Sequence, residues 1–237
     1  MARTVRQINI TKMQIVQAAM QRFLESGVSN TTQRLIAQEL GLSTGNITYY
    51  FPSKEHILSV LVEMLCEYQW DLMKRETNEG LTALLAICLE LTTMAAICEE
   101  NEIAKELYIT FYTLPRTLEI IRKNDANRAR TVFAEYTQGW TENQYLEAET
   151  LISGIEYATL MTTESSAPLE TRISGALSAL MSIYGVPQEI REMKIKKVLA
   201  MDYRSLSKRL LNDFIKFVED QNNKAIDDMA QSLKRKK

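Results

Sequence analysis

Apolar side chains recur every three or four residues along most of the chain, and no stretch alternates apolar and polar positions as a half-buried strand would. The pattern predicts a first helix that begins at Thr11, because Thr11 and Gln14 fit a capping box. Gly27 stands where a left-handed residue would end this helix. Its apolar stripe comprises Ile15, Ala18, Ala19 and Phe23.

Two short helices are expected next, within residues 31–51. Thr32 is a plausible N-cap of the first, Gly41 closes it, and Ser43 caps the second only two residues later. Helices joined by so tight a turn cross steeply, which is helix-turn-helix geometry. Ser53 then caps a long helix running to about Thr77. In the second short helix, we expect an inward face of Ile47 and Phe51 and an outward face of Thr44, Asn46, Thr48 and Tyr49.

The rest of the chain is also helical in pattern, so the predicted fold class is all-α: a three-helix helix-turn-helix domain, then a larger helical bundle. We divide it into domains at 1–56 and 57–222, with a basic tail at 223–237. The body helices are expected at roughly 80–99, 102–113, 115–138, 142–163, 168–185, 187–202 and 203–222. The last is amphipathic and suits docking on the body better than a membrane surface, because its polar face mixes both charges.

Composition supports this picture. Hydrophobic content of 46% and only 8 Gly and 4 Pro favour a folded, helical protein. The net charge of −2 conceals a basic head: residues 1–56 carry +3 and the remainder −5. Without an apolar signal core or a membrane-length apolar run, we expect a cytoplasmic protein with no membrane partner. Cys66, Cys88 and Cys98 suit buried small hydrophobes better than disulfides.

The second short helix has the chemistry of a major-groove reader. Thr44, Gly45 and Asn46 are short, so the backbone can approach base edges; Asn pairs with adenine and the Thr methyl contacts thymine. We expect the hydroxyls of Tyr49 and Tyr50 to reach phosphate oxygens. The helix starts at Thr32 and Lys54 offer backbone amides and a cation for the same purpose. The candidate double-stranded DNA contacts are Thr32, Gln33, Ser43, Thr44, Gly45, Asn46, Thr48, Tyr49, Tyr50 and Lys54.

These residues resemble the N-terminal domain of the TetR family of bacterial transcriptional regulators. The similarity covers residues 10–58, through the segments at 15–27, 36–43, 44–47 and 49–55. It implies a homodimer on a palindromic operator, a ligand pocket in each body and a repressor that leaves DNA when the pocket fills. It also implies base contacts from residues 44–46 and phosphate contacts from Thr32, Tyr49 and Lys54. The family usually has an aromatic residue where this chain has Thr48, so a phosphate contact there is shorter or lost.

Enzymatic chemistry finds no support in the residues. His56 is the only histidine, so a histidine-based triad or metal cluster cannot be assembled. No glycine-rich phosphate loop is present. We therefore expect no catalytic residue, no metal ligand and no cofactor.

Two features of the body leave alternatives open. Stripes on 145–163 (Leu151, Gly154, Ile155, Ala158) and 168–185 (Ile173, Ala176, Leu177, Leu180, Tyr184) fit a four-helix dimer interface or an intrachain core equally well. Large adaptable side chains fit a pocket for an apolar or aromatic effector, or plain core. The candidate ligand residues are Met64, Tyr68, Trp70, Met94, Tyr108, Phe111, Tyr112 and Tyr157.

The sequence thus predicts a DNA-binding transcriptional regulator, a homodimeric repressor released by a small-molecule effector of unknown identity. One alternative is a ligand-independent regulator or an activator. Another, of a different class, is a helical ligand-binding or adaptor protein that does not bind DNA.

Overall fold

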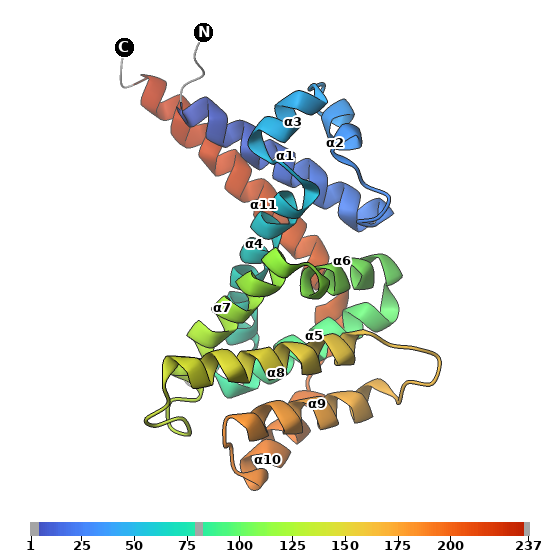
Figure 1. Ribbon diagram of the computed structural model, residues 1–237, viewed down its shortest axis with the longest axis vertical. Helices are drawn as coiled ribbons and strands as arrows, with labels where there is room; N and C mark the ends of the chain where they lie inside the picture. Colours follow the sequence, from blue (N-terminus) through green and yellow to red (C-terminus); the bar gives the residue numbers. More distant parts are fainter. Residues whose placement is uncertain (1–4, 79–82, 235–237) are drawn as a thin grey trace.

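The computed structural model of the protein describes residues 5–78 and 83–234, and this part of the chain contains eleven helices and no strand (Figure 1). The all-α class predicted from the sequence is confirmed. The helices are α1 (Val5–Ser26), α2 (Gln33–Glu39), α3 (Thr44–Tyr50), α4 (Lys54–Thr77), α5 (Leu84–Glu100), α6 (Glu102–Thr113), α7 (Pro115–Val132), α8 (Glu142–Leu160), α9 (Leu169–Ile183), α10 (Gln188–Leu199) and α11 (Tyr203–Lys234).

The head consists of α1, α2 and α3, and its two predicted short-helix caps are confirmed. The Thr32 hydroxyl accepts the Leu35 amide at 3.3 Å, and the Ser43 hydroxyl accepts the Asn46 amide at 3.1 Å. The predicted start of the first helix is wrong, because α1 begins at Val5 and Thr11 lies inside it. The N-cap of α4 is Ser53, as expected, but its hydroxyl bonds the His56 Nδ1 at 2.7 Å instead of a backbone amide.

The body is built around α4, which runs from the head into a bundle of α5, α6, α7, α8 and α9 (Figure 1). The predicted 102–113 helix coincides with α6, and most other ends differ by a few residues. The exception is the last helix, which continues to Lys234 instead of ending at residue 222. No Gly or Pro follows residue 222, so the sequence contains nothing that would stop it. Residues 235–237 of the predicted basic tail lie outside the described residues.

The last helix, α11, joins the body to the head. Its first half packs an apolar face on α4 and α5, as predicted, through the buried residues Leu206, Leu210, Phe214 and Val218. Its second half runs antiparallel to α1 (Figure 1). There Asn222 donates to the Gln17 side chain at 2.9 Å, and Gln21 donates to Glu219 at 3.3 Å. The head is therefore fastened to the rest of the molecule by the end of the chain as well as by α4.

Candidate functional site

Helix α3 presents a short polar face to solvent. Ile47 is completely buried against the head core, while Thr44, Gly45 and Thr48 are exposed and Tyr49 is 74% exposed. The Thr48 hydroxyl donates to the Thr44 carbonyl at 3.0 Å, so it is already occupied within its own helix. Small side chains at the start of the helix leave its backbone accessible to a base edge. The geometry fits insertion of α3 into a major groove.

Two of the residues expected to contact phosphate, Tyr50 and Lys54, are engaged within the head. Tyr50 is only 7% exposed, so its ring belongs to the core of the head and not to its outer face. The Lys54 ammonium donates to the Val28 carbonyl at 2.6 Å and to the Thr31 carbonyl at 3.1 Å. Lys54 thus braces the turn between α1 and α2, a role that its position at a helix start did not reveal.

Thr32 and Gln33 lie where α2 begins. Besides capping α2, Thr32 is exposed. The Gln33 amide donates to the Phe51 carbonyl at 2.6 Å, which ties α2 to the end of α3. Ser43, also exposed, caps α3. These bonds fix the relative orientation of the two helices that would meet the duplex.

A carboxylate from the body, that of Glu106, binds the turn that follows α1. Glu106 of α6 accepts the Ser29 amide at 2.7 Å and the Ser29 hydroxyl. These hydrogen bonds outweigh desolvation and hold the pKa of Glu106 below its ordinary value. Gly27, with φ of +87°, lies directly under this carboxylate, and a Cβ there would come within 2.2 Å of Glu106 Oε2. The joint between head and body therefore depends on a residue without a side chain.

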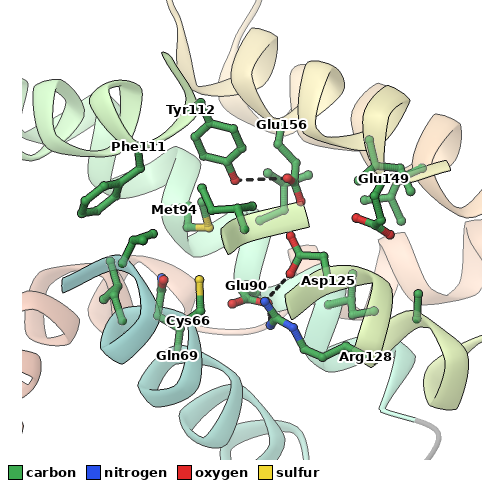
Figure 2. A pocket seen from close by; sticks show the side chains of 18 of the residues that line it. Cys66, Gln69, Glu90, Met94, Phe111, Tyr112, Asp125, Arg128, Glu149 and Glu156 are labelled. Atoms are coloured by element: carbon green, nitrogen blue, oxygen red, sulfur yellow. Dashed lines mark hydrogen bonds and ion pairs between the residues drawn. The ribbon is translucent and has the colours of Figure 1, made fainter. Parts of the chain in front are cut away.

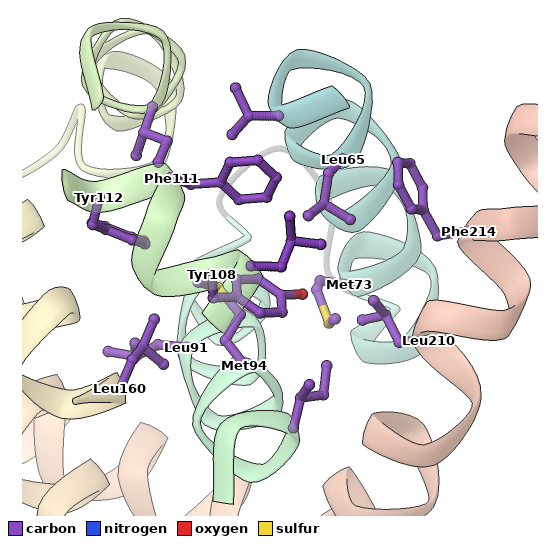
Figure 3. Packing of buried hydrophobic residues seen from close by; sticks show 14 of the residues in the cluster. Leu65, Met73, Leu91, Met94, Tyr108, Phe111, Tyr112, Leu160, Leu210 and Phe214 are labelled. Atoms are coloured by element: carbon purple, nitrogen blue, oxygen red, sulfur yellow. The ribbon is translucent and has the colours of Figure 1, made fainter. Parts of the chain in front are cut away.

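The body encloses a cavity between α4, α5, α6, α7, α8 and α9 (Figure 2). Its volume open to the centres of water molecules is about 60 Å³, enough for several waters or a compact ligand. One side of its wall is aromatic and apolar. In that wall Tyr108 accepts a hydrogen bond from Gln69 at 3.0 Å and packs between Met94, Met73 and Phe111 (Figure 3).

The other side of the cavity is acidic. Glu90 of α5, Asp125 of α7, and Glu149 and Glu156 of α8 all line it, together with a single cation, Arg128 (Figure 2). Burial raises the pKa of Glu149 to about 8 and, aided by neighbouring carboxylates, raises the pKa of Glu156 well above its ordinary value. Burial also raises the pKa values of Glu90 and Asp125, although Arg128 opposes the shift.

Half of the candidate ligand residues reach this cavity. Met94, Tyr108, Phe111 and Tyr112 line it, whereas Met64, Tyr68, Trp70 and Tyr157 do not. Met64 and Tyr68 instead face a groove beside α11, where Tyr68 stacks near Phe217 with ring centroids 5.1 Å apart. Trp70 lies under Arg128, whose guanidinium carbon is 5.2 Å from the ring centroid.

The four carboxylates were missed because sequence reasoning looked only for large apolar side chains. A signal was present. Glu90 interrupts the otherwise apolar run 84–98, and Glu149 and Glu156 are seven residues apart, which places them on one face of α8. Charged residues on the inner face of a helix indicate a cavity or a buried pair.

The outer face of α8 is exposed and apolar. Leu151 is 54% exposed, and Gly154, Ala158 and Met161 are exposed beside it. The stripe expected on the neighbouring helix is different: Ile173, Ala176, Leu177, Leu180 and Tyr184 are all buried in the protomer core. The exposed face of α9 carries small residues instead, at Gly175 and Ala179. The stripe on α9 is therefore intrachain core, whereas most of the stripe on α8 is exposed and open to a partner.

Fold and head together define a helix-turn-helix protein with a larger helical body, the architecture of a DNA-binding transcription regulator. The sequence profile described as "Bacterial regulatory proteins, tetR family" matches residues 15–61. The head therefore matches the TetR family profile, and the predicted resemblance of this region to the family is confirmed. Among proteins with curated descriptions, none matches this sequence. No helix in the described part of the chain is long and apolar enough to cross a membrane.

One solved structure, that of RolR, supports the fold, and two others are similar over most of the chain at lower TM-scores. RolR in complex with the ligand resorcinol is 17% identical and superposes with a TM-score of 0.64, covering 81% of this chain and 96% of its own. A gamma-butyrolactone receptor (ArpA-like protein) is 18% identical, with a TM-score of 0.42 and coverage of 87% and 99%. CprB from S. coelicolor A3(2), a TetR family protein, is 18% identical, with a TM-score of 0.41 and coverage of 87% and 98%.

Proposed function

We propose that the protein is a homodimeric repressor that binds a palindromic operator and leaves it when a small molecule fills the body cavity. The observation that carries this proposal is the polar face of α3, on a head whose sequence matches the family profile. On that face Thr44, Gly45 and Tyr49 are exposed and Asn46 is half-buried. Thr32, Gln33 and Ser43 flank that face, while Tyr50 and Lys54 act within the head.

The dimer is supported by the outer face of α8. Leu151, Gly154, Ala158 and Met161 are spaced three or four residues apart and exposed together. Gly and Ala allow two helices to approach closely, and exposed Leu and Met gain free energy when a second copy covers them. A two-fold axis across this face would place α8 and α9 of both protomers in a four-helix bundle.

Release by a ligand needs a connection between cavity and head, and α6 supplies one. Tyr108, Phe111 and Tyr112 of α6 line the cavity, while Glu106 of the same helix binds the turn after α1. Helix α4 makes a second connection, since Lys54 braces the head and Leu65 and Gln69 line the cavity. A ligand that shifts either helix changes the separation of the two α3 helices, which must be about 34–36 Å to enter successive major grooves.

Selection from a random duplex library at near-physiological salt tests the proposal. We expect enrichment of a palindrome whose half-sites lie one helical turn apart. The Asn46→Ala variant should lose preference at one base pair of each half-site, and Leu151→Asp should sediment as a monomer and retain only half-site binding. Binding without any enriched sequence, or enrichment by Asn46→Ala of the same site with unchanged preference, would contradict the assignment of α3 as the reader.

A further inference from the structure

The acidic half of the body cavity has more negative groups than its own cation can neutralise. Arg128 pairs with Glu90, with Nη1 to Oε2 at 2.8 Å, and with Asp125. Its guanidinium also lies over the Trp70 ring, so it is fixed from three sides. Arg128 thereby compensates the carboxylates of α5 and α7, to which its guanidinium nitrogens donate.

The two carboxyl groups of α8 accept hydrogen bonds from tyrosine hydroxyls, and for Glu149 the charges of Arg128 and Arg122 only partly offset the effect of burial on its pKa. Glu156 Oε2 accepts the Tyr112 hydroxyl at 3.1 Å, and Glu149 Oε1 accepts the Tyr184 hydroxyl. Glu149 is only 2% exposed, so burial bears most directly on its carboxyl group. A second cation on α7, Arg122, donates to Ser153 at 2.9 Å, and its charge lowers the pKa of Glu149.

These side chains converge on one space. Figure 2 shows the carboxyl groups of Glu149, Glu156 and Asp125 pointing into the cavity from two helices, opposite the wall that holds Met94 and Phe111. A buried carboxylate without a counter-charge is costly, so these carboxyl groups favour their protonated form, and a bound cation supplies the counter-charge that lets them ionise. The aromatic wall adds attraction for a cation through its ring faces and excludes a strongly hydrated inorganic ion by its apolar surface. In the described residues, no group of His, Cys, Asp and Glu side chains has metal-binding geometry.

We propose that the cavity binds a compact organic cation, an ammonium or amidinium group on an aromatic or apolar body, with Glu149 and Glu156 as its counter-charges. That this cation is the effector rests on the proposed function; that the cavity binds it does not. The cation lies between the α8 carboxylates and the aromatic side chains of α6, so it contacts the helix that also carries Glu106.

A neutral phenol is the alternative occupant, because a carboxylate also accepts hydroxyl hydrogen bonds. The two classes differ in their response to pH. In the empty cavity burial raises the pKa of Glu149 to about 8, so at neutral pH the group mainly holds its proton. A cation needs the ionised group and expels that proton, so cation affinity rises with pH until the empty cavity is itself ionised. A hydroxyl ligand gains no counter-charge, so its affinity does not increase in this manner.

The charged and titratable groups that face the cavity are distributed over all six helices. They are Cys66 of α4, Glu90 of α5, Tyr108 and Tyr112 of α6, Asp125 and Arg128 of α7, Glu149 and Glu156 of α8, and Tyr184 of α9. Burial raises the pKa values of the thiol and the three tyrosines above their ordinary values, so these groups stay neutral near pH 7. Proton release on cation binding therefore comes from carboxyl groups.

Calorimetry on the full chain with three probes tests the inference. Benzyltrimethylammonium keeps its charge at every pH, and benzyl alcohol and resorcinol are its neutral counterparts. We expect the cation to bind at least about tenfold more tightly than either, with an affinity that rises about fivefold between pH 7 and pH 8. Glu149→Gln with Glu156→Gln should reduce cation affinity by about tenfold or more. Glu147→Gln, an exposed position on the same helix, is the matched control and should leave it unchanged.

Neutral probes that bind as tightly as the cation, no cation binding at millimolar concentration, or a cation affinity independent of pH would each overturn the inference. The pH series uses the unaltered protein, so this conclusion does not depend on whether the variants fold. DNA binding is measured separately on the enriched duplex. Cation binding without DNA binding would leave the cavity assignment standing and refute the regulator. DNA binding without cation binding would do the reverse.

Discussion

Lys54 provides the sharpest test of how the head is built, because two roles for it predict opposite results. A lysine at a helix start suits a phosphate contact, but here its ammonium bonds the carbonyls of Val28 and Thr31. If the brace is its role, Lys54→Met should destabilise the turn between α1 and α2 and leave the electrostatic part of DNA binding unchanged. If it contacts phosphate, the reverse should hold.

The magnitude follows from the two hydrogen bonds. Hydrogen bonds to a charged group contribute about 1.5–3 kcal/mol each when buried. Lys54 is only partly buried, so solvent screening reduces the pair to about 1–2 kcal/mol in total. In urea this corresponds to a midpoint lower by roughly 0.5–1 M for a typical dependence on denaturant. Both tryptophans, Trp70 and Trp140, lie in the body, so circular dichroism and amide exchange of residues 26–32 report on the head better than fluorescence does.

DNA affinity measured across a salt series gives the second readout. Loss of one phosphate contact lowers the slope of log affinity against log salt by about 0.9, and loss of a brace does not. Lys12→Met removes the same charge from an exposed position of α1 and serves as the control for net charge. Tyr49→Phe is the positive control for a contact: stability should be unchanged and affinity about fivefold lower. A Lys54→Met protein with unchanged urea midpoint and a slope reduced by about one would refute the brace.

Three further predictions concern the joint, the cavity and the last helix. Gly27→Ala should lower the free energy of unfolding by about 1–2 kcal/mol because of the left-handed backbone, and by a further amount because the Glu106 carboxylate is displaced. In a Glu106→Ala background only the backbone effect should remain, so equal losses in the two backgrounds would contradict the close approach. Glu149 retains its proton in the folded state up to about pH 8 but loses it near pH 4.5 when unfolded, so the free energy of unfolding should fall by about 1.4 kcal/mol per pH unit between these values. In the Glu149→Gln variant the urea midpoint should depend less on pH over the same range. A chain ending at residue 212 lacks Phe214 and Val218 and should exchange the amides of α1 faster, whereas unchanged exchange would show that α11 does not support the head.

The sequence predicts the head better than the cavity for a physical reason. Caps such as Thr32 and Ser43 act within three residues, so their signal is local and survives in the chain order. The cavity brings together Glu90, Asp125 and Glu156 from three helices, and only packing decides whether such groups meet. Sequence reasoning found the apolar half of the wall because Tyr108, Phe111 and Tyr112 repeat along one helix.

Periodicity alone also cannot tell which molecule covers a helix face. The stripe from Ile173 to Leu180 has the spacing of an interface, yet it lies in the protomer core, while Leu151 on the neighbouring helix is exposed. The start of α1 was misplaced for a related reason: a Thr followed by Gln can cap a helix, but it does so only if the preceding residues are not already helical. The prediction ends the last helix at residue 222, where the sequence has no Gly or Pro to stop it, and α11 continues to Lys234.

The pairing of α11 with α1 has a consequence for synthesis. The ribosome releases α1 before α11, so the face of α1 around Gln17 and Gln21 lacks its partner until residues 219–222 have been made. The head can form its own three-helix core early, but it cannot be completed as an independent unit. The predicted division after residue 56 therefore carries no information about the order of assembly. A message truncated before α11 would yield a head that has formed its reading helix but lacks its final support.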